Sequence, residues 1–274
     1  QVLKTMLENV RAKSPLVHNI TNYVTVNDVA NVLLAAGGSP IMSDDADDVE
    51  DITSICGGLN INIGTLNKNT IPSMFLAGKK ANALGHIVLL DPVGAGASRL
   101  RTDTANRLMR EVRFDAVRGN ISEIKTLCTG SGTTKGVDAD AVDAVTEANL
   151  DDGVALVKAF AKQTGCIIAV TGAIDLVSDG ERCWCIRNGR AEMSRITGTG
   201  CQLSALMTAF LVANPDRKLD AAAAAVCMMG LAGEIGWANM QPGDGNSTYR
   251  DRIIDAIFNM TGDALEEGAK YELR

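Results

Sequence analysis

Aromatic residues are scarce in this chain, and their scarcity narrows the range of functions. Phe, Trp and Tyr together make up 4% of the 274 residues, so the platforms on which proteins stack nucleobases are few. The formal net charge of -7 also argues against a polyanionic partner, because nucleic-acid affinity depends on clustered Lys and Arg. We therefore expect no nucleic-acid partner. A small anion held by a local site remains compatible with this charge.

Long hydrophobic runs are lacking as well. No uninterrupted apolar run reaches the roughly 18 residues that a membrane span needs, and residues 1–13 have the pattern of an amphipathic helix and not of a signal peptide. We therefore expect a cytoplasmic protein with no membrane partner. A chain of 274 residues with 46% hydrophobic residues can bury one large core, so we predict a single domain over residues 1–274.

CxxC pairs are absent, although the chain has seven cysteines, and it has only two histidines. An odd number of cysteines set in apolar sequence is typical of reduced, buried thiols and not of a disulfide framework or a zinc site. We predict buried thiols everywhere except at Cys201, whose surroundings give it a chemical role.

Short apolar runs alternate with longer periodic stretches through the first two thirds of the chain. We predict strands at 59–63, 86–90, 115–118 and 166–170, and helices at 27–36, 71–84, 104–112 and 153–162. This order predicts an α/β fold with a mostly parallel central sheet and helices on both faces. Residues 174–177 and 182–186 flank a Ser-Asp-Gly turn and predict a small antiparallel edge. We also predict an apolar helix at 219–238, which we expect to be buried in the core.

The most informative motif is the glycine-rich segment that opens an apolar helix after residue 197. Its two glycines let the backbone approach a ligand closely, and the helix N-terminus presents unpaired N–H groups and a positive dipole end. We predict an anion hole at Gly198, Thr199, Gly200 and Cys201 that stabilises the charge on a transferring phosphoryl group. The Cys201 thiol lies on the first turn, where it feels the same dipole, and is the candidate catalytic group.

Ligands of doubly wound sheets lie outside the carboxyl ends of the strands, and Asp91 stands at one such end. It opens the sequence Asp-Pro-Val-Gly-Ala-Gly, where a carboxylate beside flexible glycines can hold hydrated Mg²⁺ near phosphates. A turn aspartate that caps Val93 or Gly94 explains the same residues equally well.

Two further strand ends carry polar side chains. Asn120 and Glu123 face the same way on a helical turn, so the carboxylate can take a metal through water while Arg118 offers a planar fork to phosphate oxygens. The alternative is a helix N-terminus capped by Asn120 with Glu123 reaching back. Thr171, followed by Gly172, could contact a nucleotide phosphate, or it could belong to a plain turn.

Near the N-terminus, the sequence mixes polar and apolar residues in a way that suits a small-molecule pocket. Asn22 could fix a ligand by hydrogen bonding, and Met42 could lie against a ring. The alternatives are a buried amide in a turn and a core methionine. We expect His18 to be a core histidine whose hydrogen bonds are satisfied.

These motifs, in this order, run through essentially the whole chain, which closely resembles the hydroxyethylthiazole kinase family of the ribokinase-like superfamily. The resemblance implies a ribokinase-like fold. It also implies Mg²⁺-dependent transfer of the ATP γ-phosphoryl group to the primary alcohol of methyl-hydroxyethyl-thiazole, for thiamine phosphate synthesis. The partners it implies are ATP, the thiazole alcohol and two further copies of the chain, in a trimer with active sites at subunit interfaces.

The resemblance also implies roles for the motif residues. The implied sites are ATP contacts at Arg118 and Thr171, with Asn120 beside them, a Mg²⁺ environment at Asp91 and Glu123, and a thiazole pocket at Asn22, Met42 and Gly198. Cys201 stands where most ribokinase-like enzymes have an aspartate that takes the hydroxyl proton. Because phosphoryl transfer relies chiefly on alignment and charge stabilisation, a weak base at this position can be tolerated.

Three alternatives stay open from the sequence. The same fold could phosphorylate a pyrimidine or pyridoxal-type alcohol, since one methyl or hydroxyl changes affinity only modestly. Cys201 could instead act as a covalent nucleophile. The chain could also be a non-catalytic sensor of a nucleotide or thiazole that keeps the pocket and has lost the transfer.

Overall fold

The sheet is the organising element of this protein, which is described by a computed structural model over residues 1–131 and 143–274. Its strands are β1 (Leu16–Ile20), β2 (Ser39–Met42), β3 (Gly58–Asn62), β4 (Ile87–Asp91), β5 (Ala116–Asn120), β6 (Ile167–Thr171), β7 (Asp175–Ser178), β8 (Cys183–Ile186) and β9 (Tyr271–Leu273). Within the described ranges they form one nine-stranded sheet of order β2-β1-β3-β4-β5-β6-β7-β8-β9. Pairing is parallel from β2 to β6 and antiparallel from β6 to β9. The predicted mostly parallel sheet with an antiparallel edge is therefore confirmed.

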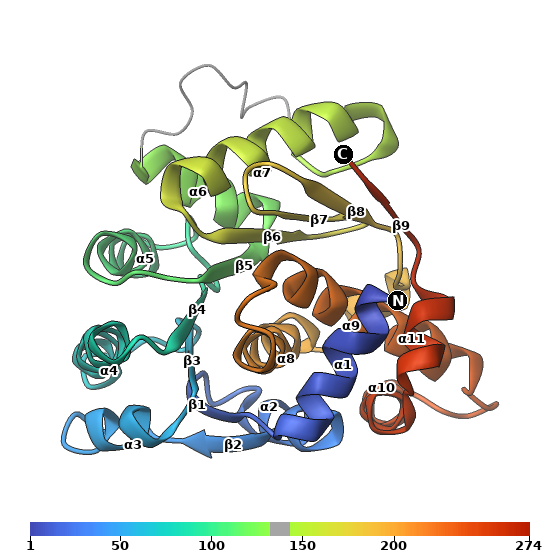
Figure 1. Cartoon of the computed structure of the whole chain (residues 1–274), viewed down its shortest axis with the longest axis horizontal. Coiled ribbons are helices and arrows are strands. Elements are labelled where there is room, and N and C mark those ends of the chain that lie inside the picture. Colours follow the sequence, from blue (N-terminus) through green and yellow to red (C-terminus); the bar gives the residue numbers. More distant parts are fainter. Residues whose placement is uncertain (132–142) are drawn as a thin grey trace.

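Helices cover both faces of this sheet (Figure 1). On one face lie α3 (Val49–Ile55), α4 (Thr70–Leu84), α5 (Arg99–Glu111), α6 (Ile121–Ser131) and α7 (Leu150–Thr164). On the other lie α1 (Val2–Lys13), α2 (Val26–Ala36), α8 (Thr199–Ala213), α9 (Lys218–Ala238), α10 (Asn246–Asn259) and α11 (Gly262–Gly268). The N-terminal amphipathic helix and the four predicted α/β helices are all present, and each begins and ends within a few residues of its expected bounds.

The strands are apolar on both faces because both faces are buried. Leu89 packs in the cluster under α8 and α9, whereas its neighbours Val88 and Leu90 pack in the cluster under α4 to α7. In the same way, Ala169 of β6 faces α8 and α9, and its neighbour Ile168 faces α4 to α7. The central strands are therefore packed between two hydrophobic cores, which fix the ends of the strands relative to one another.

Helix α9 is long and apolar enough to cross a membrane by length and composition alone. However, 78% of its apolar window is buried inside the protein, and its alanines and methionines pack among the other helices of the α8 side. This burial confirms the prediction of a core helix. The seven cysteines, all of which lie in the described ranges, are free and buried. This confirms the prediction for six of them, and Cys201, which the prediction set apart, is buried as well.

Three strands were not predicted from the sequence. β1 carries polar His18 and Asn19 within an apolar run, which hides its period. β2 contains Pro40, a residue usually confined to edge strands, and β2 lies at an edge. β9 is short and largely exposed. The predicted strands also shift by about one residue, so Asp91 and Thr171 end their strands and do not follow them.

Candidate active site

Four polar residues lie at the carboxyl ends of the central strands because of the sheet register. Asn62 at the end of β3 pairs with Asp91 at the end of β4. Asn120 at the end of β5 pairs with Thr171 at the end of β6. Since the strands are parallel, all four side chains meet at one edge of the sheet, where ligands of doubly wound folds bind.

Helix α8 begins at this same edge. Its N-cap Gly198 has φ 91°, in the left-handed region, and a Cβ built there would lie 2.5 Å from Thr25 Cγ2. A Cβ on Gly200 would lie 3.0 Å from Arg118 Nη2. Both glycines are therefore required by close approach, and the outward-pointing N–H groups of the first turn stand beside a guanidinium.

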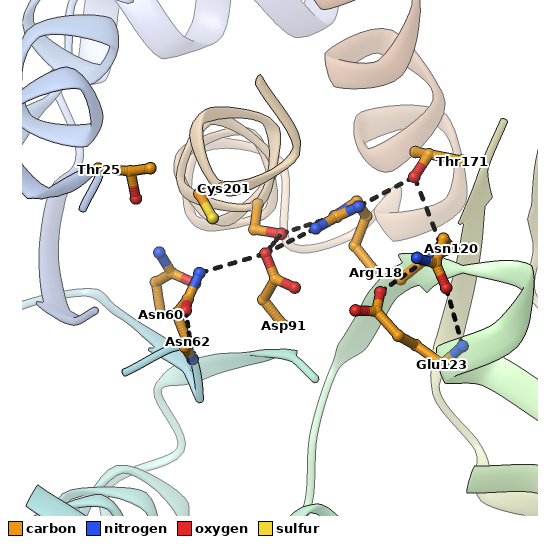
Figure 2. Close-up of polar contacts among 12 residues, drawn as sticks. Thr25, Asn60, Asn62, Asp91, Arg118, Asn120, Glu123, Thr171 and Cys201 are labelled. Carbon is orange, nitrogen blue, oxygen red and sulfur yellow. Dashed lines mark hydrogen bonds and ion pairs between the residues drawn. The ribbon is translucent and has the colours of Figure 1, made fainter. Parts of the chain in front are cut away.

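A buried ion pair lies at the centre of the site (Figure 2). Arg118 Nη2 is 2.7 Å from Asp91 Oδ2, and the two side chains are 6% and 0% exposed. Arg118 Nε donates to Ser204 Oγ at 2.8 Å and Nη1 donates to Thr171 Oγ1 at 2.9 Å. Burial acts to lower the pKa of Arg118, but the Asp91 and Glu123 carboxylates outweigh it and the pKa is raised. The guanidinium therefore stays charged.

The two oxygens of Asp91 have different surroundings. Oδ2 accepts hydrogen bonds from Arg118, from Ser204 at 2.8 Å and from Asn62 Nδ2 at 3.4 Å. Oδ1 is buried without a hydrogen-bond partner. The alternative of a turn cap is wrong for this side chain, because the Gly94 N–H donates to Glu123 Oε2 at 2.8 Å and the Val93 N–H to the Asp91 backbone carbonyl.

Glu123 serves the helix terminus and the site at once. Its Oε1 accepts from the Asn120 N–H at 2.9 Å, while its own N–H donates to Asn120 Oδ1 at 2.8 Å. This is the reciprocal capping that the sequence offered as an alternative. Burial and the nearby Asp91 carboxylate raise the pKa of Glu123, against Arg118 and the two backbone donors. The capped carboxylate is thus held close to Asp91 and Arg118.

Asp91 and Glu123 can also be tested as metal ligands. Among residues 1–131 and 143–274, no group of three or more His, Cys, Asp or Glu side chains could hold a metal. Two carboxylates with one unpartnered oxygen on Asp91 fit Mg²⁺, which usually takes one or two protein carboxylates and completes its shell with phosphate oxygens and water.

Cys201 lies on the first turn of α8 and contacts Asn22. Asn22 Nδ2 donates to Cys201 Sγ at 3.4 Å and to Asn62 Oδ1 at 3.0 Å, while its oxygen accepts from the N–H and the hydroxyl of Thr25. Asn22 therefore reaches the centre of the site, and its polar atoms hold Cys201 and the chain at Thr25 in place.

A small apolar cluster brings Val29 and Leu33 of α2 together with Cys201 and Ala205 of α8. Met42 and Val93 pack against this cluster, which places the predicted Met42 at its border. His18, by contrast, is fully buried and bonds Thr53 Oγ1 at 2.6 Å and the Ser43 carbonyl at 2.8 Å. This confirms it as a satisfied core histidine.

A pocket of about 760 Å³ opens on the other side of the α8 N-terminus. Its walls include the predicted Asn120, Thr171, Thr199 and Gly200, joined by Asn188, Met193, Leu203, Val226 and Met229. The charged residues that line it are Asp175 and Arg190. Burial raises the pKa of Asp175 to about 7, although the Gly172 N–H and Arg118 oppose the shift. The lining thus combines apolar side chains with polar ones and with the backbone at the start of α8.

Several residues of the site were missed from the sequence, among them Asn62, Asp175 and Ser204. Asn62 gave a usable signal, because an amide inside the apolar run of a buried strand needs a partner. Asp175 stands at the start of β7, where it resembles an ordinary turn residue. Ser204 gave no signal, since its role depends on contacts with β4 and β5 from far along the chain.

Comparison with known proteins decides the family. The sequence model of the hydroxyethylthiazole kinase family matches residues 7–263. The chain belongs to this family. Hydroxyethylthiazole kinase of Clostridium acetobutylicum is 58% identical over 271 residues, covering 99% of both chains. That of Ruminiclostridium cellulolyticum is 48% identical over 97% of this chain and 95% of its own length.

Solved structures agree with this assignment. The hydroxyethylthiazole kinase structure from Pyrococcus horikoshii OT3 superposes with a TM-score of 0.88 at 33% identity, covering 99% of this chain and 98% of its own. Pyridoxal kinase of Staphylococcus aureus in complex with AMP-PCP gives a TM-score of 0.62 at 15% identity, covering 94% of this chain and 97% of its own. At that identity the second match shows a shared fold, and the ribokinase-like expectation is confirmed.

Proposed function

We propose that this chain transfers the γ-phosphoryl group of ATP to the primary hydroxyl of methyl-hydroxyethyl-thiazole, giving the phosphate ester used in thiamine salvage. The observation that carries the proposal is the meeting of the α8 amides with Arg118 at the mouth of a nucleotide-sized pocket. A helix N-terminus next to a charged guanidinium is an arrangement that stabilises a transferring phosphoryl group.

The nucleotide occupies the 760 Å³ pocket in this proposal. Its base lies against the apolar side chains of Leu203, Val226 and Met229, and its phosphates reach Thr171 and Asn120. The γ-phosphate then faces the N–H groups of α8. Arg118 adds positive charge from a side chain that Asp91 and Ser204 hold in one orientation, so little reorganisation is needed during transfer.

The thiazole alcohol lies against the apolar cluster around Cys201, with its ring against Met42 and its hydroxyl beside Cys201. Asn22 and the backbone at Gly198 border the same space. The hydroxyl oxygen forms the new bond to phosphorus as the bond to the bridging oxygen of ADP breaks. Its proton passes to Cys201 Sγ, which accepts it as the thiolate and becomes the neutral thiol, and alignment supplies most of the rate.

Asp91 and Glu123 are the proposed holders of Mg²⁺. The unpartnered Asp91 Oδ1 and the nearby Glu123 carboxylate supply hard oxygen donors of the kind this ion prefers. When bound, Mg²⁺ neutralises charge on the β- and γ-phosphates. The carboxylates themselves stay fixed by hydrogen bonds. Asn62 Nδ2 donates to Asp91 Oδ2, and the Asn120 N–H donates to Glu123 Oε1.

We further propose that residues 1–274 act as one kinase domain in the cytoplasm, in homotrimers with active sites at subunit interfaces. Tyr23 and Val24, which are 79% and 57% exposed, directly follow Asn22 and lie where a neighbouring subunit could border the proposed thiazole site. Sedimentation velocity tests the oligomer: a trimer is expected, and a monomer at working concentration contradicts this part of the proposal.

A competition assay tests the acceptor. Purified protein is given ATP, Mg²⁺ and an equimolar mixture of the thiazole alcohol, a hydroxymethyl-pyrimidine and pyridoxal, and products are identified by mass spectrometry. We expect ADP and the thiazole phosphate ester to predominate. A predominant pyrimidine or pyridoxal ester would reassign the substrate, and nucleotide binding without any ester would identify a sensor.

A further inference from the structure

Ser204 lies between Arg118 and Asp91, two side chains whose types commonly form a bidentate ion pair. Arginine and carboxylate side chains commonly pair through two parallel hydrogen bonds that use both carboxylate oxygens. Here Arg118 gives only Nη2 to Asp91, at 2.7 Å, and its Nε goes to Ser204 Oγ at 2.8 Å. Ser204 Oγ in turn donates to Asp91 Oδ2 at 2.8 Å. The contacts that Arg118 and Ser204 make with Asp91 therefore both end on the same oxygen, Oδ2 (Figure 2).

The other oxygen, Asp91 Oδ1, is left buried and without a partner. An unpaired buried acceptor is costly, and native proteins seldom keep one without a reason. Arg118 Nε would be the obvious partner if the hydroxyl of Ser204 did not hold it. The Ser204 contact with Nε and the open oxygen of Asp91 thus occur together.

An ordinary helix serine uses its hydroxyl differently. Thr208, one turn further along α8 and equally buried, donates to the Ser204 backbone carbonyl at 2.8 Å, which is the usual way that such hydroxyls are satisfied inside helices. Ser204 instead points at the strand ends and bonds two charged side chains. Its hydroxyl is therefore directed to the site.

We propose that Ser204 is a positioning residue that prevents Arg118 from closing on Asp91, and so keeps Asp91 Oδ1 available to the divalent cation or to its water. This inference rests on the proposed function. The same contact directs Arg118 Nη1 toward Thr171 and the nucleotide pocket. One hydroxyl thereby leaves the Arg118 guanidinium to bind phosphate and the Asp91 carboxylate to bind the metal.

Kinetics of Ser204→Ala test the proposal, with Thr208→Val as the matched control, since each variant removes one buried hydroxyl from the same helix. We expect the Mg²⁺ concentration for half-maximal rate to rise about tenfold or more in Ser204→Ala, as loss of a hydrogen bond to a charged group would produce. The KM for the thiazole alcohol should stay unchanged. Ser204→Thr, which keeps the hydroxyl, should restore the wild-type Mg²⁺ dependence.

A fall in kcat with an unaltered Mg²⁺ requirement would overturn the proposal, because it would mean that Ser204 only supports packing. An equal change in Thr208→Val would overturn it as well. Should Ser204→Ala fail to fold, as judged by circular dichroism, Ser204→Cys takes its place, since a thiol is a poor partner for a guanidinium. It should raise the Mg²⁺ requirement in the same direction.

A crystal structure of Ser204→Ala gives a readout that does not depend on turnover. We expect Arg118 Nε within about 3.2 Å of Asp91 Oδ1, and weaker binding of Mn²⁺ by electron paramagnetic resonance. An Oδ1 that stays open, with Mn²⁺ binding unchanged, would refute the role of Ser204. If the wild-type protein makes no thiazole ester, the proposed function fails, yet these two measurements still decide the geometry.

Discussion

Arg118 and Asp91 form a 2.7 Å ion pair from which solvent is almost excluded. Burial of two charges is favourable only when they remain paired, because each alone would carry a large desolvation penalty. The pair joins β4 to β5 beneath the first turns of α8, so its integrity matters to the fold as well as to phosphate binding.

We predict that Asp91→Asn lowers the free energy of unfolding by about 3–5 kcal/mol, since it leaves Arg118 buried without its counter-ion. Urea denaturation measures the change. Asp115→Asn is the control, because Asp115 pairs with the 40% exposed Lys218 at 2.8 Å, and such a pair contributes about 1 kcal/mol or less. Equal losses in the two variants would contradict the importance of the buried pair.

Gly198→Ala should reduce kcat by about a hundredfold, the effect of a shift of order 1 Å at a reacting centre. Its φ is 91° and its Cβ would meet Thr25 Cγ2 at 2.5 Å, so the start of α8 must move. Gly243→Ala is the control, with φ 90° and nothing within 4 Å of the added Cβ. It should lose about 1–2 kcal/mol of stability and keep its activity.

The double variant Gly198→Ala with Thr25→Ser separates clash from backbone strain. Removing Thr25 Cγ2 relieves the contact and leaves the positive φ, so part of the lost rate should return. Steady-state kinetics at saturating substrates measure this. If Gly198→Ala is as active as Gly243→Ala, the amides at the start of α8 do not need their observed position.

Replacing Cys201 distinguishes proton transfer from covalent catalysis. Cys201→Asp should keep or increase the initial rate, because Asn22 Nδ2 at 3.4 Å from Sγ can donate equally to a carboxylate, which is a competent general base. Cys56→Ala, which replaces a buried cysteine at the C-terminal end of α3, serves as control. Loss of activity in Cys201→Asp, with a phosphorylated wild-type enzyme seen by intact mass, would establish a phosphocysteine instead.

Asp175 should make stability depend on pH. Burial raises its pKa from 3.8 to about 7 in the folded protein, so between about pH 4 and pH 7 the native state binds more protons than the unfolded chain, and stability falls as pH rises. The slope from this one group is at most about 1.4 kcal/mol per pH unit.

Asp175→Asn should flatten that slope while its amide oxygen still accepts the Gly172 N–H, seen at 2.9 Å in the native site. Thermal unfolding across pH 4 to 8 measures the difference. Asp179→Asn, in the turn between β7 and β8 and outside the residues that line the pocket, is the control. A wild-type slope in Asp175→Asn would show that another group titrates.

Much of the fold could be predicted because its signals are local. Glycine stops at Gly37 and Gly85 end helices in the left-handed region, with φ 102° and 70°, and buried strands read as apolar runs. β9 could not be found, since its three residues depend on pairing with β8. The candidate residues at strand ends were predictable for a similar reason: parallel strands bring them to one edge.

The links between the site residues were not predictable. Arg118 and Ser204 lie 86 positions apart in the chain, and Asn22 and Cys201 lie 179 apart. Such contacts depend on how α8 crosses the ends of β1, β3 and β4, which follows from tertiary packing. The capping role of Glu123 was visible from spacing alone, but its closeness to Asp91 was not.

The most direct test of the central claim is a crystal structure with Mg²⁺, the non-hydrolysable nucleotide AMP-PCP and the thiazole alcohol bound together. The γ-phosphate oxygens should accept hydrogen bonds from the N–H groups at the start of α8, with the alcohol oxygen within about 3.5 Å of phosphorus. A γ-phosphate bound away from those amides, or an alcohol on the far side of Cys201 from the phosphate, would contradict it.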